Sequence, residues 1–277
     1  QELTLTSTED VLAALNNQSL LPHRAPPSLG TAETAKLRGA MARFSSTTNH
    51  GTRRQDVLAA LEALEAKDFH EIARARTATR LTGGAVDGVA ALASEVPTEA
   101  MAVALGSEQS DLAAIVADTR TIAAVIGRGA PASSESDRAV ANLLGAFGLH
   151  PGGPVAAVSL LYQNHDATAA LAAATMVANQ LGSPRRCAIS ATYRVATADM
   201  TIAGRTVDNG QILSLDLERS GLEFGAGPHE CPGAWLAAQI VSGICCAIVD
   251  NSYEFDPEEI GWGSDGRAET LIMRPGP

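Results

Sequence analysis

The ten residues FGAGPHECPG, from Phe224 to Gly233, decide how the rest of this sequence is interpreted. A cysteine that only fills a core usually lies within an apolar run, whereas Cys231 lies among glycines, prolines and a histidine. Gly225 and Gly227 permit backbone conformations that other residues avoid, and they let a flat, bulky group approach the main chain closely. The stretch therefore predicts a loop that presents a thiol to a ligand.

An apolar segment, PGAWLAAQIVSGICCAIV, follows the loop and predicts a helix that begins just after Cys231. The free N–H groups and the dipole at the start of a helix stabilise a thiolate. A thiolate in such a place suits heme iron, to which it gives electron density that favours O–O cleavage. A bare G-x-G-x-x-x-C string is as often an ordinary helix start, so the longer pattern decides.

The loop fits F-x-x-G-x-x-x-C-x-G at every specified position, and the residues between them are also of permitted types. It resembles the heme-binding loop of the cytochrome P-450 family. The resemblance implies heme b as the cofactor, with its iron held by the thiolate of Cys231. It also implies a cofactor-binding role for Phe224, Gly225, Gly227 and His229.

The composition excludes several classes of protein. The chain has 277 residues, 45 % of them hydrophobic, and a net charge of −11, so it has enough apolar residues for one large core or two modest ones but no basic excess for nucleic acid. Four cysteines without a CxxC pair fit neither a secreted disulfide scaffold nor a zinc site. No segment has the pattern of a secretion signal or a membrane span, so we expect a cytoplasmic protein that binds no membrane.

The first 181 residues are rich in Ala and Leu and predict a series of helices. Ser7, three residues before Asp10, predicts a helix start. The longest predicted helix runs from Pro154 to Leu181, with proline at its start and Gly182 just after its end.

After Gly182, the segments CAISATYRVA, DMTIAGRTV and QILSLDL carry alternating β-branched residues and predict a small sheet. We therefore expect a mainly α fold with a minor β part, which the resemblance makes a reduced cytochrome P-450-like fold. It would form a single heme-binding domain over residues 1–277, helical in 1–181, with the small sheet and the cysteine loop in 182–277.

Basic residues occur in the order in which the family places partners of the heme propionates. His50 and Arg54 fit the H-x-x-x-R segment at the start of the family's C helix, and Arg194 lies in a segment that resembles the sheet after its K helix. His229 would be the fourth partner. Each alone is most simply a surface charge. All four in order, in an acidic chain, favour propionate binding.

The helix from Pro154 resembles the family's I helix, which crosses the distal face of the heme with the pattern small-small-x-acid-Thr. Asp166 keeps the acid, but Gln163 and Asn164 replace the small residues and Ala167 replaces the threonine. Thr168 lies one position further on, about 100° around a helix. For proton delivery the sequence leaves Asp166, Thr168 and Gln163 as candidate catalytic residues, beside a group on the substrate itself.

The chain resembles an unusually short bacterial-type member of the family. No room remains for separate J and K helices, and E-x-x-R is missing from that region; the strings at Glu71 and Glu135 are most simply coincidental helix pairs. No Lys or Arg lies between Cys231 and Asp250, and Ala238 stands where an arginine is common in the family. The identity of the electron donor therefore stays open: the protein uses either a ferredoxin or no electron donor.

The resemblance implies a heme-thiolate oxidoreductase that acts on a small organic molecule, in a tailoring step of bacterial secondary metabolism. Oxygen, peroxide and a non-oxidative rearrangement all remain open. The alternative is a non-catalytic helper that stabilises a partner enzyme such as a glycosyltransferase, against which the intact cysteine loop argues. A helical protein without heme is a third hypothesis, against which the four basic residues argue.

Overall fold

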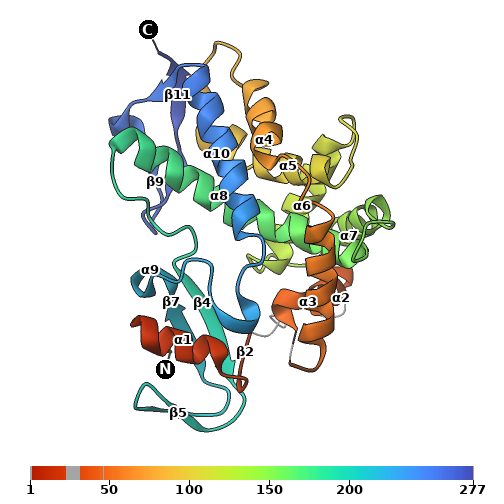
Figure 1. Ribbon diagram of the computed structural model, residues 1–277, viewed down its shortest axis with the longest axis vertical. Coiled ribbons are helices and arrows are strands. Elements are labelled where there is room, and N and C mark those ends of the chain that lie inside the picture. The colour runs from red at the N-terminus through yellow and green to blue at the C-terminus, as the bar shows by residue number, and fades with distance from the viewer. Residues whose placement is uncertain (1, 23–31, 46, 277) are drawn as a thin grey trace.

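A computed structural model describes residues 2–22, 32–45 and 47–276. Figure 1 shows a larger helical part and a smaller part in which α1 lies against a sheet. Within the described residues the α-helices are α1 (Thr8–Asn16), α2 (Glu33–Ala40), α3 (Thr47–Glu62), α4 (Phe69–Ala78), α5 (Val96–Ala104), α6 (Leu112–Ile126), α7 (Ser134–Ala146), α8 (Pro154–Leu181), α9 (Leu217–Ser220) and α10 (Ala234–Asp250). Shorter helical turns are η2 (Ala42–Phe44), η3 (Gly88–Ala93), η4 (Gly227–His229) and η5 (Pro257–Glu259).

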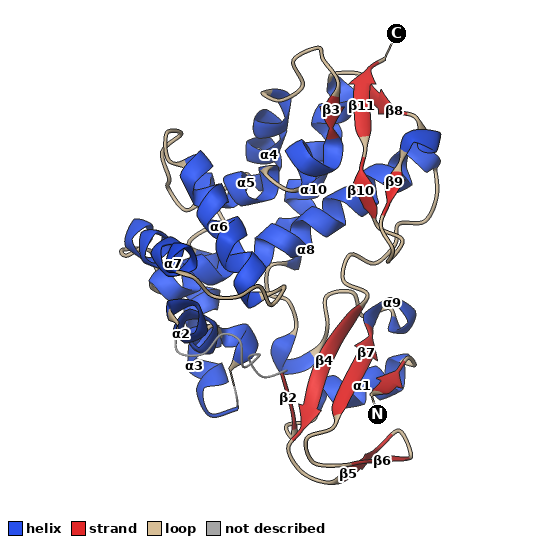
Figure 2. Ribbon diagram, turned by 180° about the vertical axis from the view of Figure 1, so that it is seen from behind, coloured by secondary structure: helices blue, strands red, loops and turns tan. Residues whose placement is uncertain are grey.

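The strands are short and form several small sheets (Figure 2). One sheet has the order β1-β7-β4-β2, a second has β3-β11-β8, and the pairs β5-β6 and β10-β9 stand apart. Their bounds are β1 (Leu3–Leu5), β2 (Leu20–Pro22), β3 (Val86–Asp87), β4 (Ala191–Ala196), β5 (Met200–Ile202), β6 (Arg205–Val207), β7 (Ile212–Asp216), β8 (Tyr253–Phe255), β9 (Gly261–Trp262), β10 (Ala268–Thr270) and β11 (Ile272–Pro275). The prediction of a mainly α fold with a minor β part is confirmed.

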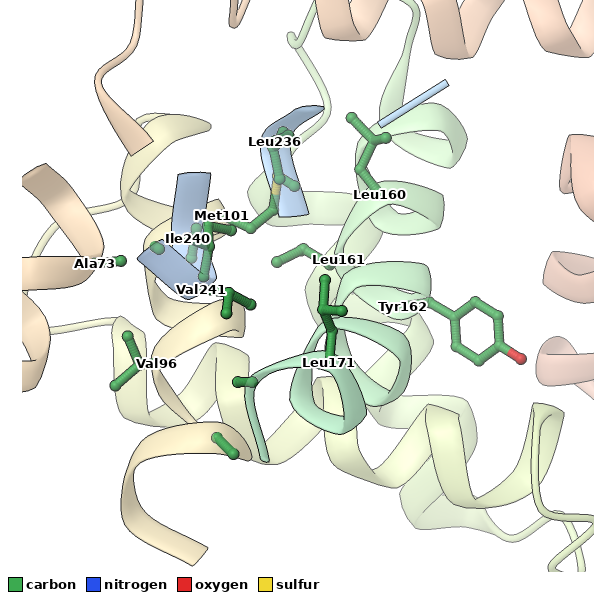
Figure 3. Close-up of a cluster of buried hydrophobic side chains, with 14 of the residues drawn as sticks. Ala73, Val96, Met101, Leu160, Leu161, Tyr162, Leu171, Leu236, Ile240 and Val241 are labelled. Carbon is green, nitrogen blue, oxygen red and sulfur yellow. The ribbon is translucent and has the colours of Figure 1, made fainter. Parts of the chain in front are cut away.

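The long helix α8 organises the helical part. It begins at Pro154 and ends at Leu181, with Gly182 in the left-handed conformation at φ 58°, as predicted. Helices α3, α5, α6, α7 and α10 all contact it. Figure 3 shows Leu161 and Leu171 of α8 beside Met101 of α5 and Val241 of α10. The apolar character of α8 nearly all round follows from these neighbours on several sides.

The N-terminal segment joins the sheet, which the sequence analysis did not predict. Leu3–Leu5 pairs in parallel with β7, and Leu20–Pro22 pairs with β4. Each segment has three residues, too few to show an alternating pattern. The helix between them begins as predicted, with the Ser7 side chain accepting a hydrogen bond from the backbone N–H of Asp10 at 3.1 Å.

Two hydrophobic cores result from this arrangement. The larger lies among α2–α8, α10 and the C-terminal strands, and the smaller lies between α1 and the sheet of β4 and β7. The smaller core joins residues near the N-terminus to residues 187–226, so the predicted boundary at residue 181 does not separate the cores. In the part of the chain that the structure describes, no helix is both long and apolar enough to cross a bilayer.

Helices α4 and α10 pack so closely that Gly243 has no room for a side chain. A Cβ there would overlap the carbonyl oxygen of His70 on α4. We expect Gly243→Ala to lower the free energy of unfolding by about 1–3 kcal/mol through overpacking, which outweighs the roughly 0.5–1 kcal/mol that alanine gains in a helix. Gly145→Ala in α7, where a Cβ meets nothing within 4 Å, should be neutral or slightly stabilising. Urea unfolding of both variants checks this, and equal midpoints would contradict it.

Candidate functional site

The cysteine loop connects the short helix α9 to α10. Gly225 and Gly227 adopt φ values of 72° and 67°, the left-handed region that favours glycine, as the sequence predicts. The backbone N–H of Cys231 donates to the carbonyl of Phe224 at 2.9 Å and closes the loop. A side chain at Gly227 would overlap Asn16 of α1. The loop is thus shaped by its own backbone and by contact with the smaller core.

The thiol of Cys231 is reachable from solvent but lies in a recess of the protein. Burial raises its pKa, and this effect outweighs a hydrogen bond from the N–H of Gly233 and the charges of Arg43 and Arg54, which lower it. The helix begins at Ala234, with Gly233 as its N-cap. The N–H of Gly233 at the helix start thus favours the thiolate, but desolvation outweighs this effect in the free protein.

Basic side chains from three distant segments meet beside the loop. The rings of His50, on α3, and His229, in the loop, have centroids 4.0 Å apart. Arg54, one turn after His50, donates through Nη1 to the carbonyl of Glu230 at 2.9 Å. Arg194 comes from β4. The structure thus brings together the four residues that the sequence analysis selected as propionate partners.

Arg194 is the most deeply buried of these cations, with 5 % of its surface exposed. Its Nη1 donates to the carbonyl of Tyr193 at 2.9 Å, but its buried Nε has no hydrogen-bond partner within the described residues. Burial, and then the charge of Arg43, lower its pKa to about 10. A buried guanidinium with an unsatisfied N–H is costly to the fold and is suited to an incoming anion.

The two histidines are held neutral by the same surroundings. Burial lowers the pKa of His229 to about 3, and the other causes are the positive groups His50, Arg194, Arg54 and Arg43. Burial and Arg54 also lower the pKa of His50. Since every charge that acts on His229 is positive, the cluster has an excess of positive potential.

The distal candidates lie on two faces of α8. The half-buried Asp166 pairs with Arg128 at 2.9 Å, and Gln163 donates to the hydroxyl of Ser159 at 3.0 Å. Thr168 is buried and donates to the side chain of Asn164 at 2.7 Å, while Asn164 donates to the carbonyl of Pro97 in the first turn of α5. The structure therefore places Gln163 and Asp166 on the more open face of α8, and Thr168 on the face toward α5.

A group that the sequence analysis missed lies beside the cluster. Arg43 in η2 is exposed, and its Cζ lies 5.9 Å from the ring centroid of Phe44. The Phe44 ring lies 6.2 Å from that of Tyr162, which Figure 3 shows extending from α8 away from the apolar cluster around Met101. Arg43 lies outside the H-x-x-x-R pattern, so no signal in the sequence linked it to the site.

A groove of about 600 Å³ runs between α8 and α10 beside Phe224. It is lined mainly by apolar side chains, including Ala238. Arg185 reaches its edge but is engaged with Glu223, with an Nη2 to Oε2 distance of 2.6 Å. Arg186 donates to the carbonyl of Gly266. These arginines are thus committed to contacts within the protein.

No family model matches this sequence, and no curated protein does. Solved structures do match: CalO2 with a TM-score of 0.76 at 16 % identity, over 99 % of this chain and 90 % of that one. The structure of P450BioI in complex with an acyl carrier protein ligated with hexadec-9Z-enoic acid matches with a TM-score of 0.77 at 16 % identity. The match covers 99 % of this chain and 92 % of that one. The structure of epothilone D-bound cytochrome P450epoK matches with a TM-score of 0.77 at 16 % identity, over 99 % of this chain and 91 % of that one. The chain therefore has the fold of the cytochrome P-450 structures.

The lowered pKa of His229 predicts a pH dependence in the protein without cofactor. Between about pH 6.5 and 3 the unfolded histidine binds a proton that the folded one does not, so the free energy of unfolding should fall as pH falls through this window. His229→Gln should reduce that slope. His150→Gln, at the connection of α7 and α8, should leave it unchanged. Urea unfolding at a series of pH values checks this; an unchanged slope in His229→Gln would contradict it.

Proposed function

We propose that this protein is a heme-thiolate oxidoreductase that oxidises a small organic molecule. The observation that carries the proposal is the meeting of Cys231 with His50, Arg54, Arg194 and His229 in a cytochrome P-450 fold. A thiol beside a cationic cluster with an unsatisfied buried guanidinium matches a cofactor that has a thiolate-binding metal and two carboxylates. The residues present therefore fit heme b.

Each part of the site has a role in holding this cofactor. Cys231 would ligate the iron, and metal binding deprotonates a thiol even where burial has raised its pKa. Arg54 and Arg194 would hold the propionates by charge-assisted hydrogen bonds, with His50 and His229 as neutral donors. Phe224, Gly225 and Gly227 would shape the loop beneath the porphyrin. A Cβ at Gly225 would meet only ordinary contacts, so that side of the loop has space.

Heme with a thiolate ligand supplies the activation of oxygen or peroxide for oxidation of an organic substrate. The protein must supply a proton where oxygen or peroxide is activated. Asp166 is the acid on the open face of α8, where Arg128 stabilises its carboxylate. We propose that it passes protons through water, with the amide of Gln163 one turn earlier helping to order that water. Ala167 has no group that relays a proton, and the Thr168 hydroxyl would have to leave Asn164 to take part.

A tailoring step in bacterial secondary metabolism is the setting that we propose. The epothilone D-bound structure of P450epoK supports it by similarity of fold. Residues 232–250 contain no Lys or Arg, so α10 offers no basic patch on which an acidic electron donor could dock. We further propose that the electron donor docks elsewhere or that peroxide is the oxidant. A non-catalytic helper role remains the alternative and would be favoured if the protein carried no heme.

We expect the protein to purify with heme b, and its reduced carbon-monoxide complex to show the red-shifted Soret band of thiolate ligation. Cys231→Ala should lose that band because it removes the axial ligand. Cys245→Ala, a matched change within α10, should keep it. Absorption spectra and the heme-to-protein ratio check this. A protein without heme, or an unchanged band in Cys231→Ala, would refute the proposal.

We expect Asp166→Asn to lower turnover by about 10²–10⁴-fold, the usual contribution of general acid assistance, while the heme spectrum stays intact. Ala167→Thr should be neutral or harmful, because the other residues of this helix are not arranged around a hydroxyl there. Asp118→Asn on α6 is a matched control that should keep full activity. Turnover with the true substrate, measured beside the heme spectrum, checks this. Full activity of Asp166→Asn would exclude proton delivery through this carboxylate.

A further inference from the structure

The position of Arg43 sets it apart from the other arginines of the cluster. Its charge acts on Cys231 and His229 in the loop, on Arg194 in β4 and on Tyr162 in α8, so it lies within electrostatic reach of all of them. It belongs to η2, which follows α2 and precedes α3. Its Cζ lies 5.9 Å from the ring centroid of Phe44, whose ring lies 6.2 Å from that of Tyr162, so the guanidinium lies near this aromatic pair.

Aromatic and cationic contacts hold this segment in place. The guanidinium of Arg38 lies 3.9 Å from the ring centroid of Phe44, a cation–π contact on one side of the residue after Arg43. The Phe44 ring also packs near Tyr162. The half-buried ring of Phe44, packed near the largely buried Tyr162, thus lies next to an exposed guanidinium.

The protein offers no carboxylate to this guanidinium. The ion pairs within the described residues involve none of Arg43, Arg54 and Arg194. Every Asp and Glu of the sequence lies within those residues. Asp166, the acid on the open face of α8, is already paired with Arg128 at 2.9 Å. Any carboxylate that pairs with Arg43 would therefore come from a bound molecule.

Heme would supply only part of that charge. Its two propionates match Arg54, which donates to the cysteine loop at Glu230, and Arg194, whose buried Nε is unsatisfied within the described residues. Arg43 then remains as a third guanidinium without an anion, on the side toward Phe44 and Tyr162.

We propose that Arg43 binds a carboxylate of the organic substrate, whose carbon skeleton packs on Phe44 and Tyr162. This inference rests on the proposed function and narrows the substrate class to organic acids. A guanidinium offers a carboxylate two parallel hydrogen bonds, so it fixes orientation as well as charge. The aromatic rings next to it supply apolar area for the rest of the molecule.

The test compares acids with their neutral amides. Octanoate and octanamide, and 4-phenylbutyrate and 4-phenylbutyramide, are titrated into the heme-loaded protein, with the ferric Soret shift and the heat of binding as readouts. We expect at least one acid to bind about tenfold or more tightly than its amide, the usual gain from a charge-assisted hydrogen bond. Arg43→Gln should abolish this preference and keep the heme-to-protein ratio of the wild type.

Two further variants make the result specific. Arg54→Gln should weaken heme retention, which distinguishes a propionate partner from Arg43. Arg274→Gln removes an exposed arginine of β11 that pairs with Glu259 of η5. This variant should change neither heme retention nor the preference for acids. The inference is overturned if no acid binds more tightly than its amide, if Arg43→Gln keeps the preference, or if it loses heme as Arg54→Gln does. Failure of the wild type to hold heme would instead overturn the proposed function.

Discussion

The concentration of positive charge beside Cys231 is the constraint on which the site depends. Arg194 is buried with one N–H unsatisfied within the described residues, and the charges that shift the pKa of His229 are all positive. The folded chain tolerates this because both histidines stay neutral and the guanidinium of Arg194 has a lowered pKa. An anionic cofactor would offset this positive charge and offer a partner to the unsatisfied N–H of Arg194, so binding and stability should be linked through the same residues.

This charge lies where the two hydrophobic cores approach each other. Gly227 of the cysteine loop touches Asn16 beside the smaller core, whereas the backbone of Glu230 accepts a hydrogen bond from Arg54 on α3 of the helical part. The loop is thus held from both sides. A cofactor that binds Cys231, α3 and β4 together would join the two cores, which gives the site a structural role as well as a chemical one.

The polar side chains of α8 between residues 163 and 168 lie on two faces of the helix. Alanine stands at 167, and the hydroxyl of the next residue, Thr168, is buried and donates to Asn164. Asp166 and Gln163 remain on the more open face, and Arg43 lies on the side of Tyr162. The more open face of α8 therefore presents a carboxylate and an amide, those of Asp166 and Gln163.

The sequence by itself determined the features that depend on local backbone preference. The helix from Pro154 to Leu181, the caps at Ser7 and Gly182, and the left-handed glycines of the loop all follow from neighbouring residues, and all were predicted. Only the tertiary structure decided the strands at Leu3 and Leu20, the pKa of Cys231 and the place of Arg43. Three-residue strands carry no period, and desolvation and electrostatic reach depend on residues far apart in the chain, so no local pattern encodes them.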